Sequence, residues 1–192
     1  EERALLRHHM TTFGFYGGSF DPPHLGHVAV ARWAITAGGL DRLLVAPVFD
    51  HPFAKAMGAS FEHRVAMCRL AFGDLPGVEI SEIERELGGE SRTLRTLGAL
   101  HARHPGVRFR LVVGADVLAD AHRWHRWDDI VALAPPLVAG RAGTERGDSP
   151  PLFDASSTEL RAALFRGERP AHLVDQRVLD YIDAHGLYRG DA

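Results

Sequence analysis

Two histidines three residues apart lie in the stretch Gly17-Gly18-Ser19-Phe20-Asp21-Pro22-Pro23-His24-Leu25-Gly26-His27. On a helical turn the side chains of His24 and His27 would share one face, where imidazolium groups could donate hydrogen bonds to phosphate oxygens. The two glycines that open the stretch allow a sharp turn and a close approach of the backbone to a phosphate. A helix that begins beside these residues would add amide donors and partial positive charge. The stretch therefore predicts a phosphate site, in which Ser19 offers a hydroxyl group.

A zinc pair is the alternative chemistry for histidines at this spacing. Such a site needs a third ligand and usually a catalytic carboxylate nearby. Asp21 is close in the sequence, but no other residue has ligand spacing. We therefore favour phosphate over zinc and expect no metal held by protein side chains.

A second candidate anion site lies in Ser156-Ser157-Thr158-Glu159-Leu160-Arg161. Ser156 with Glu159 three residues later is a capping box, which predicts a helix over 157–165. Hydroxyl and amide groups of its first turn, together with the Arg161 guanidinium, could bind a phosphate. From these residues alone, a helix cap and a solvated arginine are the simpler interpretation.

Three further features have both a structural and a functional interpretation. Asp116, in Gly114-Ala115-Asp116 after an apolar run, could accept a ribose hydroxyl or cap the next helix. Lys55 is the only lysine, and it could be a surface residue or a cation that closes over phosphates. Trp124 and Trp127 could lie in the core or stack on a ligand ring.

The segments between these sites predict a doubly wound parallel α/β sheet. The run Leu43-Leu44-Val45-Ala46 is apolar throughout, as in strands that are buried on both faces. Strand patterns alternate with helix patterns along the chain, which favours parallel pairing. We expect strands over 12–16, 40–48, 78–83, 107–113 and 137–139, and helices over 25–37, 61–72, 93–103, 130–134 (capped by Asp128), 157–165 and 175–185, with a short one starting at 117.

Composition fits one globular domain over 1–192, with residues 1–10 set aside as a tag or disordered extension. Of the 192 residues 45% are hydrophobic and 24% charged, and the net charge of −3 argues against a general nucleic-acid binder. Cys68 is the only cysteine, so no internal disulfide is possible and a cytoplasmic location is expected. No apolar run reaches the roughly 20 residues of a membrane span. The sequence leaves open whether the chain forms a homo-oligomer.

These motifs together resemble the nucleotidyltransferase superfamily with a His-x-Gly-His motif, and most closely its bacterial nicotinate-mononucleotide adenylyltransferases. The resemblance runs from Phe13 to Arg189. It implies a Rossmann-like sheet of the nucleotidyltransferase type with a C-terminal helical segment. The motifs that carry it, in the same order as in the family, are Gly17 to His27, Gly114 to Asp116, Trp124, Ser156 to Arg161 and Gly186-Leu187-Tyr188.

The resemblance also implies a reaction, in which ATP and nicotinate mononucleotide give deamido-NAD and pyrophosphate, with Mg²⁺ carried in by ATP. The acceptor phosphate is already an anion, so neither a protein nucleophile nor a strong base is needed. The implied catalytic residues are His24, His27 and Arg161. The implied ATP-binding residues are Gly17, Gly18, Ser19, Phe20, Lys55, Gly114, Asp116, Ser157 and Thr158, and the implied pyridine-nucleotide residues are Thr93, Arg92 and Trp124.

Two segments depart from the pattern of that family. His51 to Lys55 stands where the family has Pro-Pro-His-Lys, and Glu90-Ser91-Arg92-Thr93 stands where it has Pro-Ser-Tyr-Thr. Arg92 near an acid-substituted ring would favour nicotinate over nicotinamide, as a hypothesis. The alternatives are a related enzyme that uses nicotinamide mononucleotide or another phosphate acceptor, and a nucleotide sensor without turnover.

Overall fold

A computed structural model describes residues 10–50, 57–140, 148–149, 153 and 155–190. A five-stranded sheet with strand order β3-β2-β1-β4-β5 forms its centre, and all four strand pairs are parallel. The expected parallel α/β class is thus confirmed. The strands are β1 (Thr12–Gly18), β2 (Arg42–Pro47), β3 (Val78–Ile80), β4 (Arg108–Gly114) and β5 (Pro136–Ala139).

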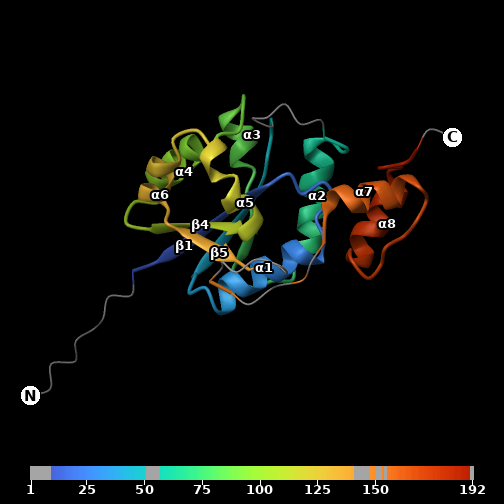
Figure 1. The fold of residues 1–192 in the computed structure, drawn as a ribbon, viewed down its shortest axis with the longest axis horizontal. Helices are drawn as coiled ribbons and strands as arrows, with labels where there is room; N and C mark the ends of the chain where they lie inside the picture. The colour runs from blue at the N-terminus through green and yellow to red at the C-terminus, as the bar shows by residue number, and fades with distance from the viewer. Residues whose placement is uncertain (1–9, 51–56, 141–147, 150–152, 154, 191–192) are drawn as a thin grey trace, which may run out of the picture.

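Helices connect the strands and follow the last one (Figure 1). They are α1 (Leu25–Thr36), α2 (Phe61–Phe72), α3 (Ile83–Leu87), α4 (Thr93–Arg103), α5 (Ala115–Ala119), the 3₁₀ turn η1 (Ala121–Arg123), α6 (Trp127–Leu133), α7 (Ser157–Phe165) and α8 (Gln176–Ala184). None of the helices in these described ranges is long and apolar enough to span a membrane.

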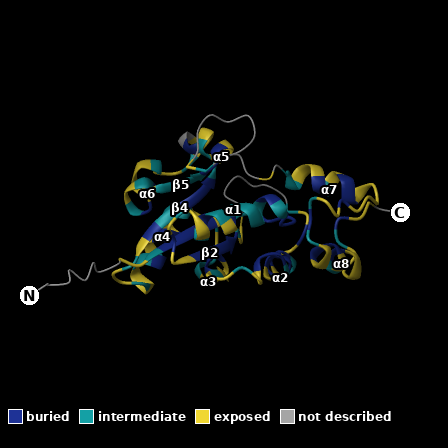
Figure 2. Ribbon diagram, turned by 90° about the horizontal axis from the view of Figure 1, so that it is seen from below, coloured by how far each residue is buried: buried dark blue, intermediate teal, exposed yellow. Residues whose placement is uncertain are grey.

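The sheet is buried on both faces because successive side chains of its strands point to opposite sides. In β2, Leu43 and Val45 pack with residues of α1, α2, α7 and α8. Leu44 and Ala46 pack on the other face with residues of α3, α4 and α6. Figure 2 shows these strands in the colour of buried residues, while the helices expose their outer sides. The apolar run in β2 therefore supplies both cores.

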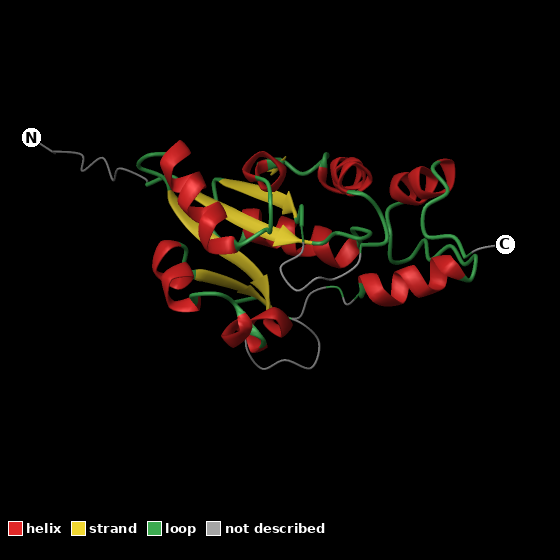
Figure 3. Ribbon diagram, turned by 90° about the horizontal axis from the view of Figure 1, so that it is seen from above, coloured by secondary structure: helices red, strands yellow, loops and turns green. Residues whose placement is uncertain are grey.

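The strand order reverses between β1 and β4, which are neighbours in the sheet although two strands separate them in sequence. In open parallel sheets a crevice forms at this point beyond the carboxyl ends of the strands. The C-terminal helices α7 and α8 lie beside α2 beyond that same end of the sheet (Figures 1 and 3). The fold thus leaves a crevice bordered by segments from both ends of the chain.

Several predicted boundaries were wrong. The strand expected over 78–83 ends at Ile80, because the charged stretch Ile83–Leu87 forms α3. The helix expected from 117 begins at Ala115 and gives way to η1. Asp128 lies inside α6 and not at its cap, because Arg126 adopts a left-handed backbone (φ 56°) that starts the helix earlier. Gly17 and Gly18 are the last residues of β1 and not part of a loop.

Candidate functional site

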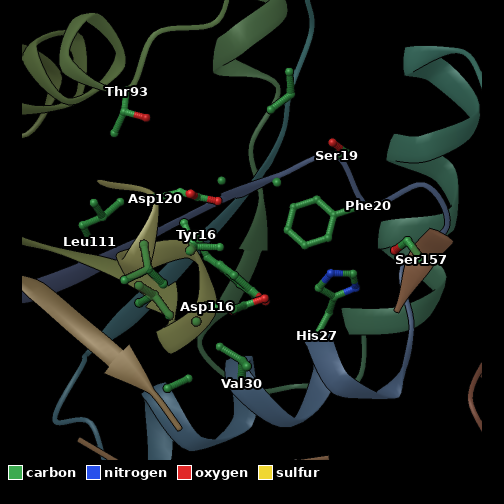
Figure 4. Close-up of a pocket in the computed structure, with 18 of the residues that line it drawn as sticks. Tyr16, Ser19, Phe20, His27, Val30, Thr93, Leu111, Asp116, Asp120 and Ser157 are labelled. Carbon is green, nitrogen blue, oxygen red and sulfur yellow. The ribbon is translucent and has the colours of Figure 1, made fainter. Parts of the chain in front are cut away.

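A cavity of about 670 Å³ opens at the carboxyl ends of β1 and β4. This volume is within the range of small-molecule sites. Figure 4 shows His27 and Ser157 toward one end of the lining and Thr93 toward the other, with Asp116 between them. The predicted residues that line it are Gly17, Gly18, Ser19, Phe20, His24, His27, Arg92, Thr93, Gly114, Asp116, Trp124, Ser157 and Thr158.

The phosphate loop, as we call residues 17–27, holds its two histidines as a reciprocal helix cap. The backbone N–H of His27 donates to His24 Nδ1 (3.3 Å), and the backbone N–H of His24 donates to His27 Nδ1 (3.1 Å). The rings stack with centroids 3.6 Å apart. A nitrogen that accepts carries no proton, so the proton of each ring is on Nε2. In this arrangement Nε2 is the ring atom of each histidine that can donate to a phosphate oxygen.

The sharp turn of the phosphate loop occurs at Phe20, and not at the glycines as predicted. Phe20 has φ 46°, a left-handed conformation that costs free energy for a residue with a side chain. Its ring is buried against Tyr16 and His27, with centroids 5.4 and 4.9 Å away. Gly18 allows close packing, because a Cβ there would lie 3.1 Å from the Phe20 ring and the ring would have to shift by a few tenths of an ångström.

The start of α7 packs directly against the phosphate loop. Ser157 Oγ donates to the Pro22 carbonyl (3.0 Å), and Arg161 donates to the Asp21 carbonyl (2.7 Å) and to Thr158 Oγ1 (3.3 Å). Arg161 itself does not line the cavity. Ser156 is the N-cap residue as predicted, but its side chain makes no capping bond, so the expected capping box is absent.

The ends of β4 and β1 place a carboxylate and a phenol, respectively, at the cavity. Asp116 is exposed in the first turn of α5, and a Cβ on Gly114 would lie 2.5 Å from its Oδ1, so a larger residue at position 114 would displace this carboxylate. Burial and the nearby Asp116 charge raise the pKa of Tyr16. Tyr16 therefore keeps its proton, and sequence reasoning had not marked it as a lining residue.

The opposite end of the cavity is formed by the start of α4. Arg92 is its N-cap residue and makes no side-chain capping bond, so capping does not occupy the first-turn amides. The Arg92 guanidinium is exposed and donates to Glu90 Oε2 (2.7 Å). Ser91 Oγ accepts from the Phe49 amide (3.0 Å) and ties this segment to the end of β2.

Sequence reasoning missed the buried contacts of three residues, namely Asp21 within the phosphate loop and Arg64 and Tyr188 packed against it. Arg64 is 1% exposed and donates to the carbonyls of Ser19 (2.8 Å), Val48 (2.7 Å) and Ala59 (3.2 Å). A detectable signal existed, because Arg64 lies three and four residues from Phe61 and Cys68 on an otherwise apolar helix face. A charged residue on such a face marks a buried polar contact.

Two further predictions concern Lys55 and a bound metal ion. Lys55 lies outside the described residues. Within the described part of the chain, no three His, Cys, Asp or Glu side chains are grouped to hold a metal ion. The third ligand that a zinc site at His24 and His27 would need is not found among these residues.

Comparison with known proteins agrees with this architecture. The cytidylyltransferase-like family matches residues 15–163, more than half of the chain. A solved structure of a Plasmodium falciparum nicotinic acid mononucleotide adenylyltransferase, complexed with NaAD, superposes with a TM-score of 0.82 at 19% identity, covering 93% of this chain and 97% of that one. The fold and site thus define a cytidylyltransferase-like nucleotidyltransferase.

Closer relatives narrow this class. A probable nicotinate-nucleotide adenylyltransferase of Anaeromyxobacter dehalogenans is 48% identical over 91% of this chain and 95% of its own length. The Myxococcus xanthus relative of the same name is 41% identical over 90% and 92%. The chain belongs to the nicotinate-nucleotide adenylyltransferase family.

Proposed function

We propose that this enzyme joins ATP and nicotinate mononucleotide to give deamido-NAD and pyrophosphate. The observation that carries the proposal is one cavity with donor groups for phosphates at one end and a separate acceptor end at α4. His24, His27 and Ser157 lie at the first end, and Thr93 lies at the second. The names of the relatives support the choice of substrates.

The proposed chemistry is a direct in-line displacement. An oxygen of the mononucleotide phosphate attacks the α-phosphorus of ATP, and the bond to the bridging oxygen of the β-phosphate breaks, so pyrophosphate leaves with that electron pair. The nucleophile is already an anion, so no proton has to be removed. The Nε2–H groups of His24 and His27 would donate to the phosphate oxygens as charge builds in the transition state.

The other residues position the two substrates. Gly17, Gly18, Ser19 and Phe20 would line the phosphates, and Ser157 with Thr158 would hold the leaving pyrophosphate, with Arg161 adding positive charge beside Thr158. Gly114 and Asp116 would receive the adenosine ribose, and Trp124, Thr93 and Arg92 the pyridine nucleotide. ATP would enter as its magnesium complex, the metal held by phosphate oxygens. We propose a cytoplasmic location for this activity.

The test is pyrophosphate release from ATP with a panel of acceptors. We expect rapid release with nicotinate mononucleotide, and much slower release with nicotinamide mononucleotide, pantetheine phosphate or glycerol phosphate. Faster release with one of these others would assign the enzyme to that acceptor. ATP binding without release for any acceptor would favour a nucleotide sensor.

Arg92 should set the preference for the acid-substituted ring. We expect Arg92→Ala to reduce the ratio of kcat/KM for nicotinate over nicotinamide mononucleotide about tenfold, the effect of losing roughly 1.4 kcal/mol of charge-assisted bonding. Arg95→Ala is the matched control, because Arg95 is also exposed on α4, bonds the Gly88 and Glu90 carbonyls and does not line the cavity. An unchanged ratio in Arg92→Ala would show that Arg92 does not contribute to recognition of the acid-substituted ring.

A further inference from the structure

A buried carboxylate lies within the phosphate loop. Asp21 is 0% exposed, and its oxygens accept hydrogen bonds from the amides of Gly58 (2.6 Å) and Ala59 (3.0 Å) and from the Tyr188 hydroxyl (2.6 Å). Asp21 does not line the cavity, so the proposed reaction does not use it directly. A carboxylate removed from water requires such donors, and each of them fixes its position.

Tyr188 is the most distant of these donors in sequence, 167 residues from Asp21. It follows α8 and is 4% exposed. Burial and the bond to Asp21 raise the pKa of Tyr188, so its hydroxyl keeps the proton that it donates. Its backbone is left-handed (φ 54°), a conformation that persists in a residue with a side chain only where its surroundings hold it.

The segment 19–22 makes further contacts besides those of the Asp21 carboxylate. Arg64 binds the Ser19 carbonyl on one side of Phe20, and Asp21 lies on the other side. The strained turn at Phe20 is therefore fixed at both of its flanks. Through the Asp21 and Pro22 carbonyls the segment also holds α7, which carries Ser157 and Thr158.

We propose that Tyr188 is a positioning residue for adenylyl transfer. Its hydroxyl fixes Asp21, and Asp21 fixes the phosphate loop relative to the start of α7. His24 and His27 are thereby held at the separation from Ser157 that the α-phosphate and the leaving pyrophosphate require. The expected effect of Tyr188 on kcat rests on the proposed function. Its expected effect on ATP affinity rests on the geometry of the site alone.

Tyr188→Phe removes the hydroxyl and keeps the buried ring. We expect kcat with ATP and nicotinate mononucleotide to fall by about tenfold to a hundredfold, the loss that follows when reacting groups shift by a fraction of an ångström to one ångström. The KM for nicotinate mononucleotide should stay near the wild-type value, because the α4 end of the cavity is not bonded to Tyr188. A smaller folded fraction would also lower the apparent kcat at an unchanged KM, so kcat is compared only at temperatures where thermal unfolding shows that all of the protein is folded.

Tyr181→Phe is the matched control. The Tyr181 hydroxyl bonds His63 Nδ1 (2.9 Å) between α8 and α2, and neither residue lines the cavity. Both variants lose one hydroxyl from the C-terminal segment, and both are assayed well below their unfolding temperatures. We expect wild-type kcat for Tyr181→Phe.

Gly58→Ala tests the same contact by displacing the Tyr188 ring while its hydroxyl is kept. A Cβ at Gly58 would lie 2.7 Å from the Tyr188 ring and 3.0 Å from Arg161 Cδ, so the tyrosine has to move. We expect this variant to lower kcat as Tyr188→Phe does, with the KM for the acceptor again unchanged.

ATP affinity, measured by calorimetry without acceptor, separates this inference from the proposed function. We expect weaker binding in Tyr188→Phe than in Tyr181→Phe, even if the wild type does not turn over nicotinate mononucleotide. Inactivity of the wild type would contradict the proposed function alone. Equal ATP affinity and equal kcat in the two tyrosine variants, or a parallel change in kcat and acceptor KM, would overturn the role of Tyr188.

Discussion

Replacing His24 with alanine will lower kcat by about 10²- to 10³-fold, the usual effect of removing one donor to a charge that develops in the transition state. The imidazole Nε2–H is the group that would meet the α-phosphate oxygens. The same substitution removes the cap of α1, since His24 Nδ1 accepts from the His27 amide. It should therefore also reduce the free energy of unfolding by about 1 kcal/mol. Steady-state kinetics and thermal unfolding measure the two losses separately.

Two further variants separate the two nitrogens of His24. His24→Asn keeps an acceptor near the position of Nδ1, so it should restore stability and leave the enzyme slow. His24→Gln can bring an amide donor to the position of Nε2, so it should recover part of the activity without the cap. Near-normal turnover in His24→Asn would contradict the assigned role of the ring.

The largest loss of stability is expected for Arg64→Met. The variant fills most of the volume but leaves the carbonyls of Ser19, Val48 and Ala59 without the bonds that Arg64 donates. Burial lowers the pKa of Arg64, because leaving water disfavours its charge, and the nearby Asp21 carboxylate opposes that shift. Removing one partner of such a buried set reduces the free energy of unfolding by about 3–5 kcal/mol. In a chain of this size the melting temperature should fall by roughly 10 °C.

Arg69→Met on the same helix is the control. Arg69 forms an ion pair with Glu82 and its side chain is 60% exposed, so its loss should change the free energy of unfolding by less than about 1 kcal/mol. Melting curves of both variants give the comparison. An Arg64→Met protein as stable as Arg69→Met would show that the three carbonyl contacts contribute little.

Local patterns predicted the parts of this molecule that depend on near neighbours in sequence. The apolar run of β2 predicted a strand buried on both faces, and the glycine–histidine stretch was expected between a strand and a helix, where it joins β1 to α1. The boundaries of α2 and α4 were predicted from periodicity and agree with the structure. Each of these rests on spacing within one element, which the sequence displays directly.

The remaining features depend on contacts between distant segments. Ile83–Leu87 is too short and too charged to show a helical period, so α3 was missed. The turn at Phe20 was assigned to the neighbouring glycines, because no local rule predicts a phenylalanine with positive φ. The contact of Asp21 with Tyr188 joins two segments that are 167 residues apart in sequence. Arg161 was expected in the cavity because its bond to the Asp21 carbonyl, also between distant segments, could not be predicted from the sequence.

The fate of the ATP α-phosphate is the most direct measurement of what this enzyme does. ATP labelled at that phosphate is incubated with nicotinate mononucleotide, and the products are separated and identified by mass. Adenylyl transfer to nicotinate mononucleotide predicts that the label appears in deamido-NAD, with one pyrophosphate released for each dinucleotide formed. Label found only in AMP, or a dinucleotide made from nicotinamide mononucleotide and not from nicotinate mononucleotide, would contradict it.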